Sequence, residues 1–149
     1  MPSRQRARQR ALQILFQWDA RREPIDEAIR AYYESLYSEE SAGPPERDDF
    51  VDQLVRGVVT HLQDIDSRIA RHAEHWRLER MPAVDRNVLR MGVYEMKEVG
   101  TAPAIVIDQA LELARRYSTE ESVHFVNGVL DAVRRELDLP TSSAESTGR

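Results

Sequence analysis

The sequence contains no cysteine, which excludes disulfide bonds, thiolate catalysis and cysteine-ligated zinc sites. It has no apolar run long enough to cross a bilayer as a helix, which excludes a transmembrane span. Near the N-terminus there is no apolar core followed by a cleavage site, so no secretory signal is expected. These absences together predict a cytoplasmic protein that makes no contact with a membrane.

Acidic and basic residues are distributed unevenly along the 149-residue chain. The net charge is −5, yet residues 1–18 carry Arg4, Arg6, Arg8 and Arg10 and no acid, so the remainder carries −9. A protein with one basic pole can bind a polyanion in a single orientation, whereas a uniformly acidic protein would repel it. With 41% hydrophobic and 32% charged residues, the composition is that of a globular protein.

Strand-like alternation of apolar and polar residues is missing, and apolar positions recur at intervals of three and four, which predicts an all-α fold. Helices are expected over 3–20, from Pro24 to Leu36, from Asp48 to Ile69 as one helix or as two with a break near His61 to Asp64, over 83–99, from Pro103 to Ala114, and from Ser118 to Leu137. Ser3 is available as a cap for the first helix, Gly100 is expected to end the fourth segment, and Ser118 and Glu121 match a capping box.

These segments fall into two groups, so we expect about seven helices in two small lobes, roughly 3–75 and 82–138, within one compact domain over 1–139. The apolar stripes are too wide for a strict coiled-coil seam and favour a packed bundle. The segment 41–45 is a loop by composition, and the polar residues 140–149 are expected to be disordered.

The arginines of the first expected helix are the strongest functional signal. Arg6, Arg10 and Gln13 lie opposite the apolar stripe, whereas Arg4 and Arg8 point along it, where an overhanging first turn would leave them in water. Guanidinium groups bind phosphates and stack on unpaired bases, and glutamines reach base edges. The alternatives are a solvated, frayed terminus and a contact with the acidic remainder of the chain. Single-stranded RNA is favoured over duplex DNA because no helix-turn-helix or zinc-finger pattern is present.

Signals for catalysis and metal binding are few, and no glycine-rich phosphate loop is present. His72 and His75 share a helix face but lack a third ligand, and Ser122 and His124 lack a third partner for a triad. Glu95 falls inside the apolar arc of its helix, and we interpret it as a partner in a structural hydrogen bond or ion pair rather than a proton-transfer group. We therefore expect no enzyme activity, no cofactor and no metal.

Three blocks of the sequence resemble the NusB family of bacterial transcription antitermination factors. The blocks are Arg6-Ala-Arg-Gln-Arg-Ala-Leu-Gln-Ile-Leu-Phe-Gln-Trp18, Val84-Asp-Arg-Asn-Val-Leu-Arg-Met-Gly-Val-Tyr-Glu95, and Pro103-Ala-Ile-Val-Ile-Asp-Gln-Ala-Leu-Glu-Leu-Ala114 continuing to Ser122-Val-His-Phe-Val-Asn-Gly-Val-Leu-Asp131. They occur in the order and spacing of that family, and the resemblance covers about residues 4–136.

The resemblance implies a non-enzymatic antitermination factor with an all-α fold in two lobes. It implies binding of boxA RNA together with NusE, a small-subunit ribosomal protein, and loading onto RNA polymerase with NusA and NusG to support processive transcription of ribosomal RNA operons. The RNA-binding positions that carry over are Arg4, Arg6, Arg8, Arg10, Gln13, Glu121 and His124. The positions that carry over to the NusE-facing side are Phe16, Asp85 and Arg86.

Two alternatives to this function remain open. The first is a protein-only helical adaptor, or a homodimer in which the arginine helix is buried. The second, which is less favoured, is a lone relative of the NusB-like RNA-binding domain found at the N-terminus of some ribosomal RNA cytosine methyltransferases.

Overall fold

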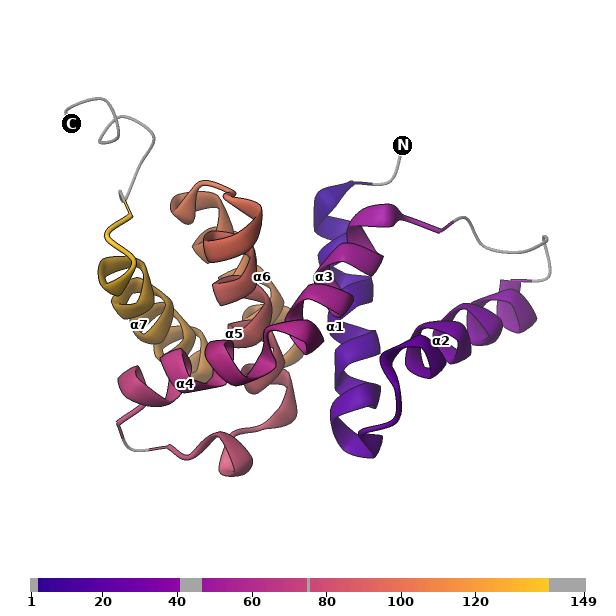
Figure 1. The fold of residues 1–149 in the computed structure, drawn as a ribbon, viewed down its shortest axis with the longest axis horizontal. Coiled ribbons are helices and arrows are strands. Elements are labelled where there is room, and N and C mark those ends of the chain that lie inside the picture. Colours follow the sequence, from indigo (N-terminus) through magenta and orange to yellow (C-terminus); the bar gives the residue numbers. More distant parts are fainter. Residues whose placement is uncertain (1–2, 41–46, 75, 140–149) are drawn as a thin grey trace. The chain divides into compact units, whose positions relative to one another are not determined.

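The computed structural model describes residues 3–40, 47–74 and 76–139, apart from the side chains of 37–40. These residues form seven α-helices, a 3-10 turn and a π-helical turn, with no strand among them (Figure 1). The elements are α1 (Arg4–Arg21), α2 (Ile25–Glu40), α3 (Asp49–Thr60), α4 (Leu62–His72), η1 (Leu78–Arg80), α5 (Ala83–Tyr94), η2 (Glu95–Val99), α6 (Pro103–Tyr117) and α7 (Glu120–Glu136). The predicted all-α fold is confirmed, whereas the expected loop at 41–45 and tail at 140–149 lie outside the described residues.

The chain divides into two units, residues 1–60 and 61–149. The first unit contains α1, α2 and α3, and the second contains α4 to α7 with η1 and η2. The sequence predicts that the boundary between the two lobes lies between residues 75 and 82, after α4. The structure places it before α4, because α4 packs against α5 and α7.

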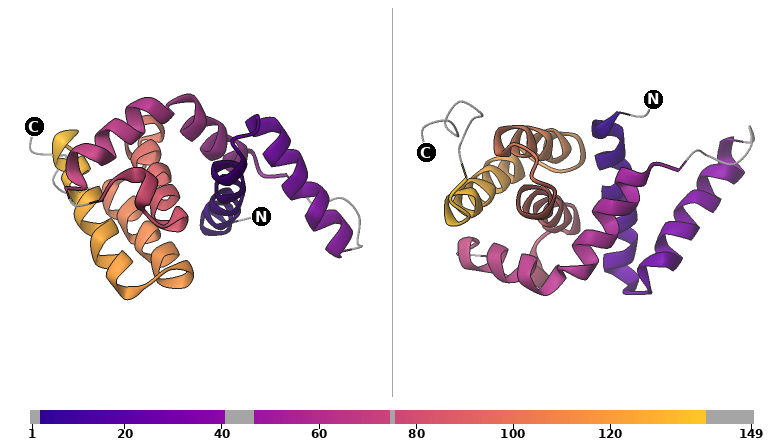
Figure 2. Two further views of the ribbon diagram at one scale, coloured as in Figure 1. Left: turned by 90° about the horizontal axis from the view of Figure 1, so that it is seen from below. Right: turned by 45° about the horizontal axis from the view of Figure 1, so that its top comes forward.

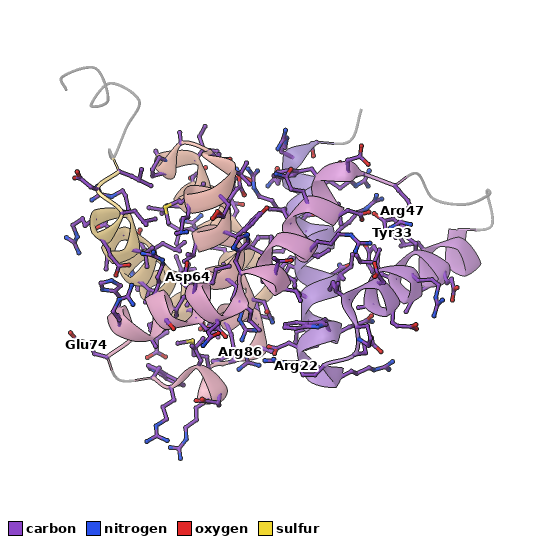
Figure 3. The ribbon with its side chains drawn as sticks, in the orientation of Figure 1. Arg22, Tyr33, Arg47, Asp64, Glu74 and Arg86 are labelled. Carbon is purple, nitrogen blue, oxygen red and sulfur yellow. The ribbon has the colours of Figure 1, made fainter. Side chains whose placement is uncertain are left out.

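In the first unit, α2 and α3 pack on α1. The α1 helix begins where the Ser3 hydroxyl oxygen accepts a hydrogen bond from the backbone N–H of Arg6 at 3.0 Å, as predicted. The buried apolar side chains are Ala7, Ala11, Leu12, Ile14, Leu15 and Trp18 of α1, Ala28, Ile29, Tyr32 and Tyr33 of α2, and Phe50, Val51, Leu54, Val55 and Val58 of α3. Just before α3, Arg47 stacks over Tyr33, with its guanidinium carbon 4.9 Å from the ring centroid (Figure 3). The apolar stripe predicted for the first helix is therefore the face that it buries.

The long apolar segment from Asp48 to Ile69 forms two helices, the second of the two predicted alternatives. The first ends at Thr60 and the next begins at Leu62. His61 lies between them with φ −102° and ψ 19°, and its ring centroid is 6.0 Å from that of Tyr94. The break therefore falls at the start of the interval that the sequence indicates.

In the second unit, α5, α6 and α7 pack side by side, and both views of Figure 2 show this group of helices. Pro103 is the first residue of α6, and Gly100 ends the preceding segment with a left-handed φ of 82°, as predicted. The expected helix over 83–99 is present, but its last five residues form the π-helical turn η2. Glu95 begins that turn and is only 2% exposed, so its carboxylate is buried, a point that the sequence left open.

Two glycines of the second unit are expected to respond in opposite ways to an added methyl group. A Cβ on Gly92 of α5 would lie 3.0 Å from both δ carbons of Leu130 in α7, and Leu130 is fully buried. A Cβ on Gly128, within α7, would meet nothing within 4 Å. We expect Gly92→Ala to lower the free energy of unfolding by about 1–3 kcal/mol through overpacking. We expect Gly128→Ala to raise it by about 0.5–1 kcal/mol through helix propensity. Urea unfolding followed by circular dichroism measures both, and changes of the same sign would contradict the close approach of α5 to α7.

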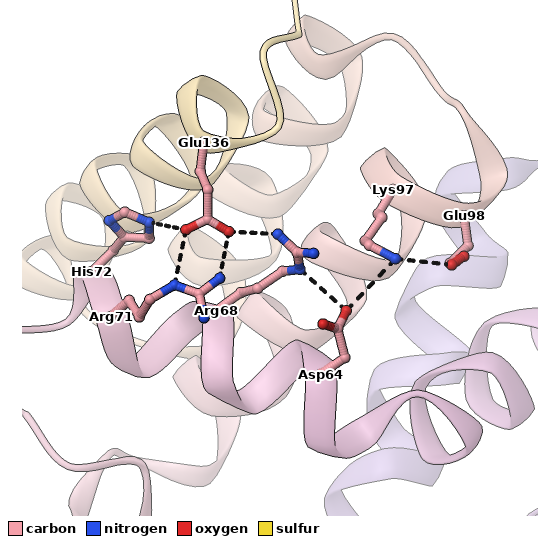
Figure 4. A network of polar contacts seen from close by, with 7 residues as sticks. All are labelled: Asp64, Arg68, Arg71, His72, Lys97, Glu98 and Glu136. Atoms are coloured by element: carbon pink, nitrogen blue, oxygen red, sulfur yellow. Dashed lines mark hydrogen bonds and ion pairs between the residues drawn. The ribbon is translucent and has the colours of Figure 1, made fainter.

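Seven polar side chains link α4, η2 and α7 on the surface of the second unit (Figure 4). They are Asp64, Arg68, Arg71, His72, Lys97, Glu98 and Glu136. The Glu136 carboxylate is the acceptor at the centre of the network: it accepts a hydrogen bond from Arg71 at 2.6 Å and lies 2.6 Å from Nε2 of His72. The network therefore ties the end of α7 to α4.

This network predicts a pH-dependent contribution to stability. The hydrogen bonds from Arg71, together with those from His72 and Arg68, lower the pKa of Glu136 from its ordinary value of 4.5 to about 2. A carboxylate whose pKa is depressed in the folded state stabilises the fold above its unfolded pKa, and that contribution is lost as the pH falls toward the folded value. We expect the stability advantage of the wild type over Glu136→Gln to be present at about pH 5 and to shrink toward pH 3. Denaturant unfolding at both pH values measures the advantage, and an advantage that does not shrink would count against the network.

The interior of the second unit also holds an ion pair. Arg90 of α5 is 2% exposed and is the largest of the fully buried side chains. Its Nε and Nη2 donate to the two carboxylate oxygens of Asp66 in α4, at 2.8 and 2.9 Å, and its Nη1 donates to Asn87 at 3.0 Å. This forked, charge-assisted geometry joins α4 to α5.

Candidate nucleic-acid interface

The first turns of α1 present arginines to solvent. The side chains of Arg4 and Arg6 are exposed, and neither forms an ion pair with a described carboxylate. The guanidinium carbon of Arg4 lies 3.8 Å from the centroid of the Phe50 ring, a stack that occupies one face of the group and leaves its N–H edges available. The first turn of α1 has no acid, and the positive end of a helix dipole adds to the arginine charge. These positive charges repel one another, and an anion bound at the start of α1 would relieve that repulsion.

Arg8, one turn further along α1, is buried rather than exposed. It is 7% exposed, and its guanidinium carbon is 5.7 Å from the same Phe50 ring. The expectation that an overhanging first turn leaves both Arg4 and Arg8 in water is therefore wrong for Arg8, because the overhang ends within the first turn and α3 packs along the next. Among the other predicted positions, Gln13 is exposed and Arg10 is half-buried.

The second unit has a pocket of about 840 Å³ beside the start of α7. Aromatic and apolar side chains form part of its lining: Trp76, Met81, Pro82, Tyr117 and Phe125. Polar side chains from the α5 and α7 ends complete it: Asp85, Ser118, Thr119, Glu121, Ser122 and His124. Trp76 is 48% exposed, and its ring centroid lies 6.4 Å from that of Phe125. The structure thus places two predicted RNA-binding residues, Glu121 and His124, on the lining of one pocket.

The N-terminus of α7 is capped one residue later than the sequence predicts. Thr119 is the cap, and its Oγ1 accepts a hydrogen bond from the backbone N–H of Ser122 at 3.1 Å. The expected capping box of Ser118 and Glu121 is therefore wrong, because the Ser118 hydroxyl donates instead to Asp85 of α5. Glu121 is exposed, as is His124 one turn further along.

Three positions are expected to face a protein partner, and of these only Phe16 is exposed, at 46%. Asp85 is 4% exposed and accepts hydrogen bonds from two serine hydroxyls within the second unit. Arg86, labelled in Figure 3, is half-buried and donates to the backbone carbonyls of Leu78 and Met81, at 2.7 and 3.0 Å. Asp85 and Arg86 are thus engaged in shaping the second unit itself.

The residues considered for metal binding and catalysis have other partners. His72 belongs to the Glu136 network, His75 lies outside the described residues, and the Ser122 hydroxyl donates to Asp85. Within the described ranges, no group of three or more histidine, aspartate or glutamate side chains is arranged to hold a metal ion. None of the helices in these ranges has the length and apolar character that a membrane crossing requires.

The sequence did not single out the aromatic side chains of the pocket. Tyr117 and Phe125 belong to α6 and α7, and only their partial exposure in the folded chain distinguishes them from core residues. A tryptophan in the short linker before Met81-Pro82, rather than on a helix stripe, is the one signal that could have indicated the pocket.

Within the described residues, seven α-helices in two units, with the exposed side chains of Arg4 and Arg6 on the first turn of α1, define a small all-helical protein with a cationic start to its first helix. The model of the NusB family matches residues 5–135. The transcription antitermination protein NusB of Solibacter usitatus is 66% identical over 142 residues, which cover 95% of each chain. The NusB of Salinispora arenicola is 43% identical over 134 residues, or 89% of this chain and 96% of that one. The chain belongs to the NusB family.

Solved structures agree with this assignment. T. maritima NusB superimposes with a TM-score of 0.76 at 34% identity, over 91% of this chain and 92% of that one. A structure of the antitermination factors NusB and NusE in complex with dsRNA superimposes with a TM-score of 0.76 at 30% identity, over 89% of this chain and 96% of that chain.

Proposed function

We propose that this chain is a non-enzymatic transcription antitermination factor that binds single-stranded boxA RNA together with NusE. The observation that carries the proposal is the pair of exposed arginines, Arg4 and Arg6, at the start of α1 in a chain whose other residues are net acidic. Membership in the NusB family supports it, since a similar NusB has been solved with NusE and dsRNA.

In the first unit, the guanidinium edges of Arg4 and Arg6 bind RNA phosphates. Arg10 adds charge from its half-buried position, and the exposed amide of Gln13 offers a donor and an acceptor to a base edge. Arg8 acts from inside: it shares the Phe50 ring with Arg4 and so helps to fix the stack that orients Arg4. Arginine suits this task because its planar fork matches phosphate geometry.

In the second unit, Glu121 and His124 make the RNA contacts. Both are exposed near the start of α7 and line the pocket that holds the Trp76 and Phe125 rings. A carboxylate accepts hydrogen bonds from base amino and imino groups, whereas imidazole N–H donates to a phosphate or to a base acceptor. The contacts of this unit therefore distinguish bases, while those of the first unit supply most of the electrostatic attraction.

NusE binds a helical surface that includes Phe16, whose exposed ring is suited to burial against a protein partner. Arg86 and Asp85 contribute indirectly, by holding the segment before α5 and the turn before α7. NusB and NusE each hold part of the same RNA, so each raises the affinity of the other by linkage. The assembly then joins RNA polymerase with NusA and NusG in the cytoplasm and supports processive transcription of ribosomal RNA operons.

The test is the affinity for a labelled boxA RNA, measured by fluorescence anisotropy with and without NusE. We expect binding by the chain alone, and an increase in affinity of about tenfold or more when NusE is present. A scrambled RNA of equal length is the control. Equal affinity for both RNAs with no response to NusE would overturn the proposal. If light scattering then showed a stable dimer, the homodimer with a buried arginine helix would replace it.

A further inference from the structure

Asp85 is a buried carboxylate beside the proposed RNA-binding residues of α7. It lies in the first turn of α5, is 4% exposed, and lines the same pocket as Glu121 and His124. Its contacts are with Ser118, in the turn that joins α6 to α7, and with Ser122, in the first turn of α7, both far from it in the sequence. Asp85 therefore connects the start of α5 to the start of α7.

The contact is a pair of short hydrogen bonds. The Ser118 hydroxyl donates to Oδ1 of Asp85 at 2.7 Å, and the Ser122 hydroxyl donates to Oδ2 at 2.7 Å. The two hydroxyls also lie 2.8 Å from each other, so Asp85, Ser118 and Ser122 form one cluster in which each carboxylate oxygen has a hydroxyl partner. Hydrogen bonds to an ionised acceptor are shorter and stronger than neutral ones. The negative charge is also favoured by the positive ends of the helix dipoles of α5 and α7.

Ser122 also takes part in the cap of α7. Ser122 Oγ lies 3.1 Å from the hydroxyl of Thr119, and Thr119 caps α7 through the backbone N–H of Ser122. Ser122 is thus held by Asp85 through its side chain and by the cap through its backbone. Since Glu121 precedes Ser122 and His124 follows two residues later, the directions of both side chains depend on how this turn is held.

We propose that Asp85 is a positioning residue for the RNA-binding end of α7: by accepting from Ser118 and Ser122, it fixes the first turn of α7 and so aims Glu121 and His124 at the RNA. This inference rests on the proposed function. The expectation from the sequence is that Asp85 itself faces NusE. Here Asp85 acts instead through α7, because its carboxylate is only 4% exposed and is bound by two serine hydroxyls at the start of that helix.

The first part of the test uses RNA binding by the full chain without NusE, with boxA RNA as the probe. Asp85→Ala removes both acceptors, and we expect it to weaken binding by about fivefold. Asp85→Asn keeps the shape and one acceptor and can donate to a serine oxygen, so we expect a smaller loss. Ser122→Ala removes one of the two donors and should resemble Asp85→Asn.

A double-mutant cycle separates positioning from a general loss of stability. In a His124→Ala background, the effect of Asp85→Ala should be clearly reduced, because one of the two contacts that Asp85 aims is already gone. In an Arg6→Ala background, the fivefold effect should persist, because Arg6 belongs to the other unit and does not depend on the turn. Two-dimensional amide NMR of the RNA-free protein should show changes for Asp85→Ala at residues 118–124 and none at residues 4–13.

Three results would overturn the positioning role while leaving the proposed function intact. They are wild-type RNA affinity for Asp85→Ala, an undiminished effect of Asp85→Ala in the His124→Ala background, and unchanged amide signals at residues 118–124. If the wild-type chain did not bind boxA RNA, both proposals would fall. The affinity of the wild type is therefore measured first, and it separates a failure of the proposed function from a failure of the positioning role alone.

Discussion

Replacing Arg90 with alanine is expected to lower the free energy of unfolding of the second unit by about 3 kcal/mol. Arg90 is 2% exposed, and its two forked hydrogen bonds are the link between α5 and Asp66 of α4. Its removal leaves a cavity in place of the largest fully buried side chain and takes the guanidinium partner from the carboxylate of Asp66, and both effects are unfavourable.

Chemical unfolding followed by circular dichroism measures this loss, and Arg115→Ala is the matched control. Arg115 lies in the same unit and pairs with Glu112 at 2.8 Å, but each side chain of that pair is 50% exposed. An exposed pair contributes less than about 1 kcal/mol, so the control should be near neutral. Equal losses for the two variants would show that burial of the Arg90 pair does not govern its contribution.

The double substitution Arg4→Ala, Arg6→Ala is expected to weaken binding of boxA RNA by about tenfold at physiological salt. Each arginine that neutralises a phosphate of a single strand contributes about −0.7 to the slope of log K against log salt concentration. We therefore expect the slope of the double variant to be shallower by about 1.4. Both side chains are exposed, and the one packing contact that is lost is the stack of Arg4 on Phe50, so the free energy of unfolding should fall by only about 1 kcal/mol or less.

Arg21→Ala is the control for this substitution. Arg21 is also exposed, carries the same charge and lies at the opposite end of α1, about 25 Å from Arg4 at 1.5 Å per residue. We expect it to retain the wild-type slope. If both changes reduced the slope equally, the RNA would be responding to net charge rather than to a site at the start of α1.

The sequence was sufficient to predict the helices because each one buries a single apolar stripe with a period near 3.6 residues. The stripe from Ala7 to Trp18, the cap at Ser3, and the ends marked by Gly100 and Pro103 all follow from local chemistry. None of these features depends on which helices pack together.

The features that the sequence could not predict depend on tertiary contacts. Arg8 is buried because Phe50, on another helix, covers that turn of α1. Ser118 and Thr119 are equally suitable caps by residue type, and the choice between them follows from Asp85 on α5, which binds the Ser118 hydroxyl. The same holds for the RNA-binding positions carried over from the NusB family. Residue type alone does not show that Arg6 is exposed whereas Arg8 is buried.

The most direct test of the central claim is an amide NMR titration of the isotope-labelled chain with single-stranded boxA RNA. The cationic start of α1 and the first turn of α7 should respond together, with the largest signal changes at residues 4–13 and 121–124. Changes confined to other helices, with the signals of Arg4 and Arg6 unmoved at saturation, would contradict the claim that these arginines hold the RNA.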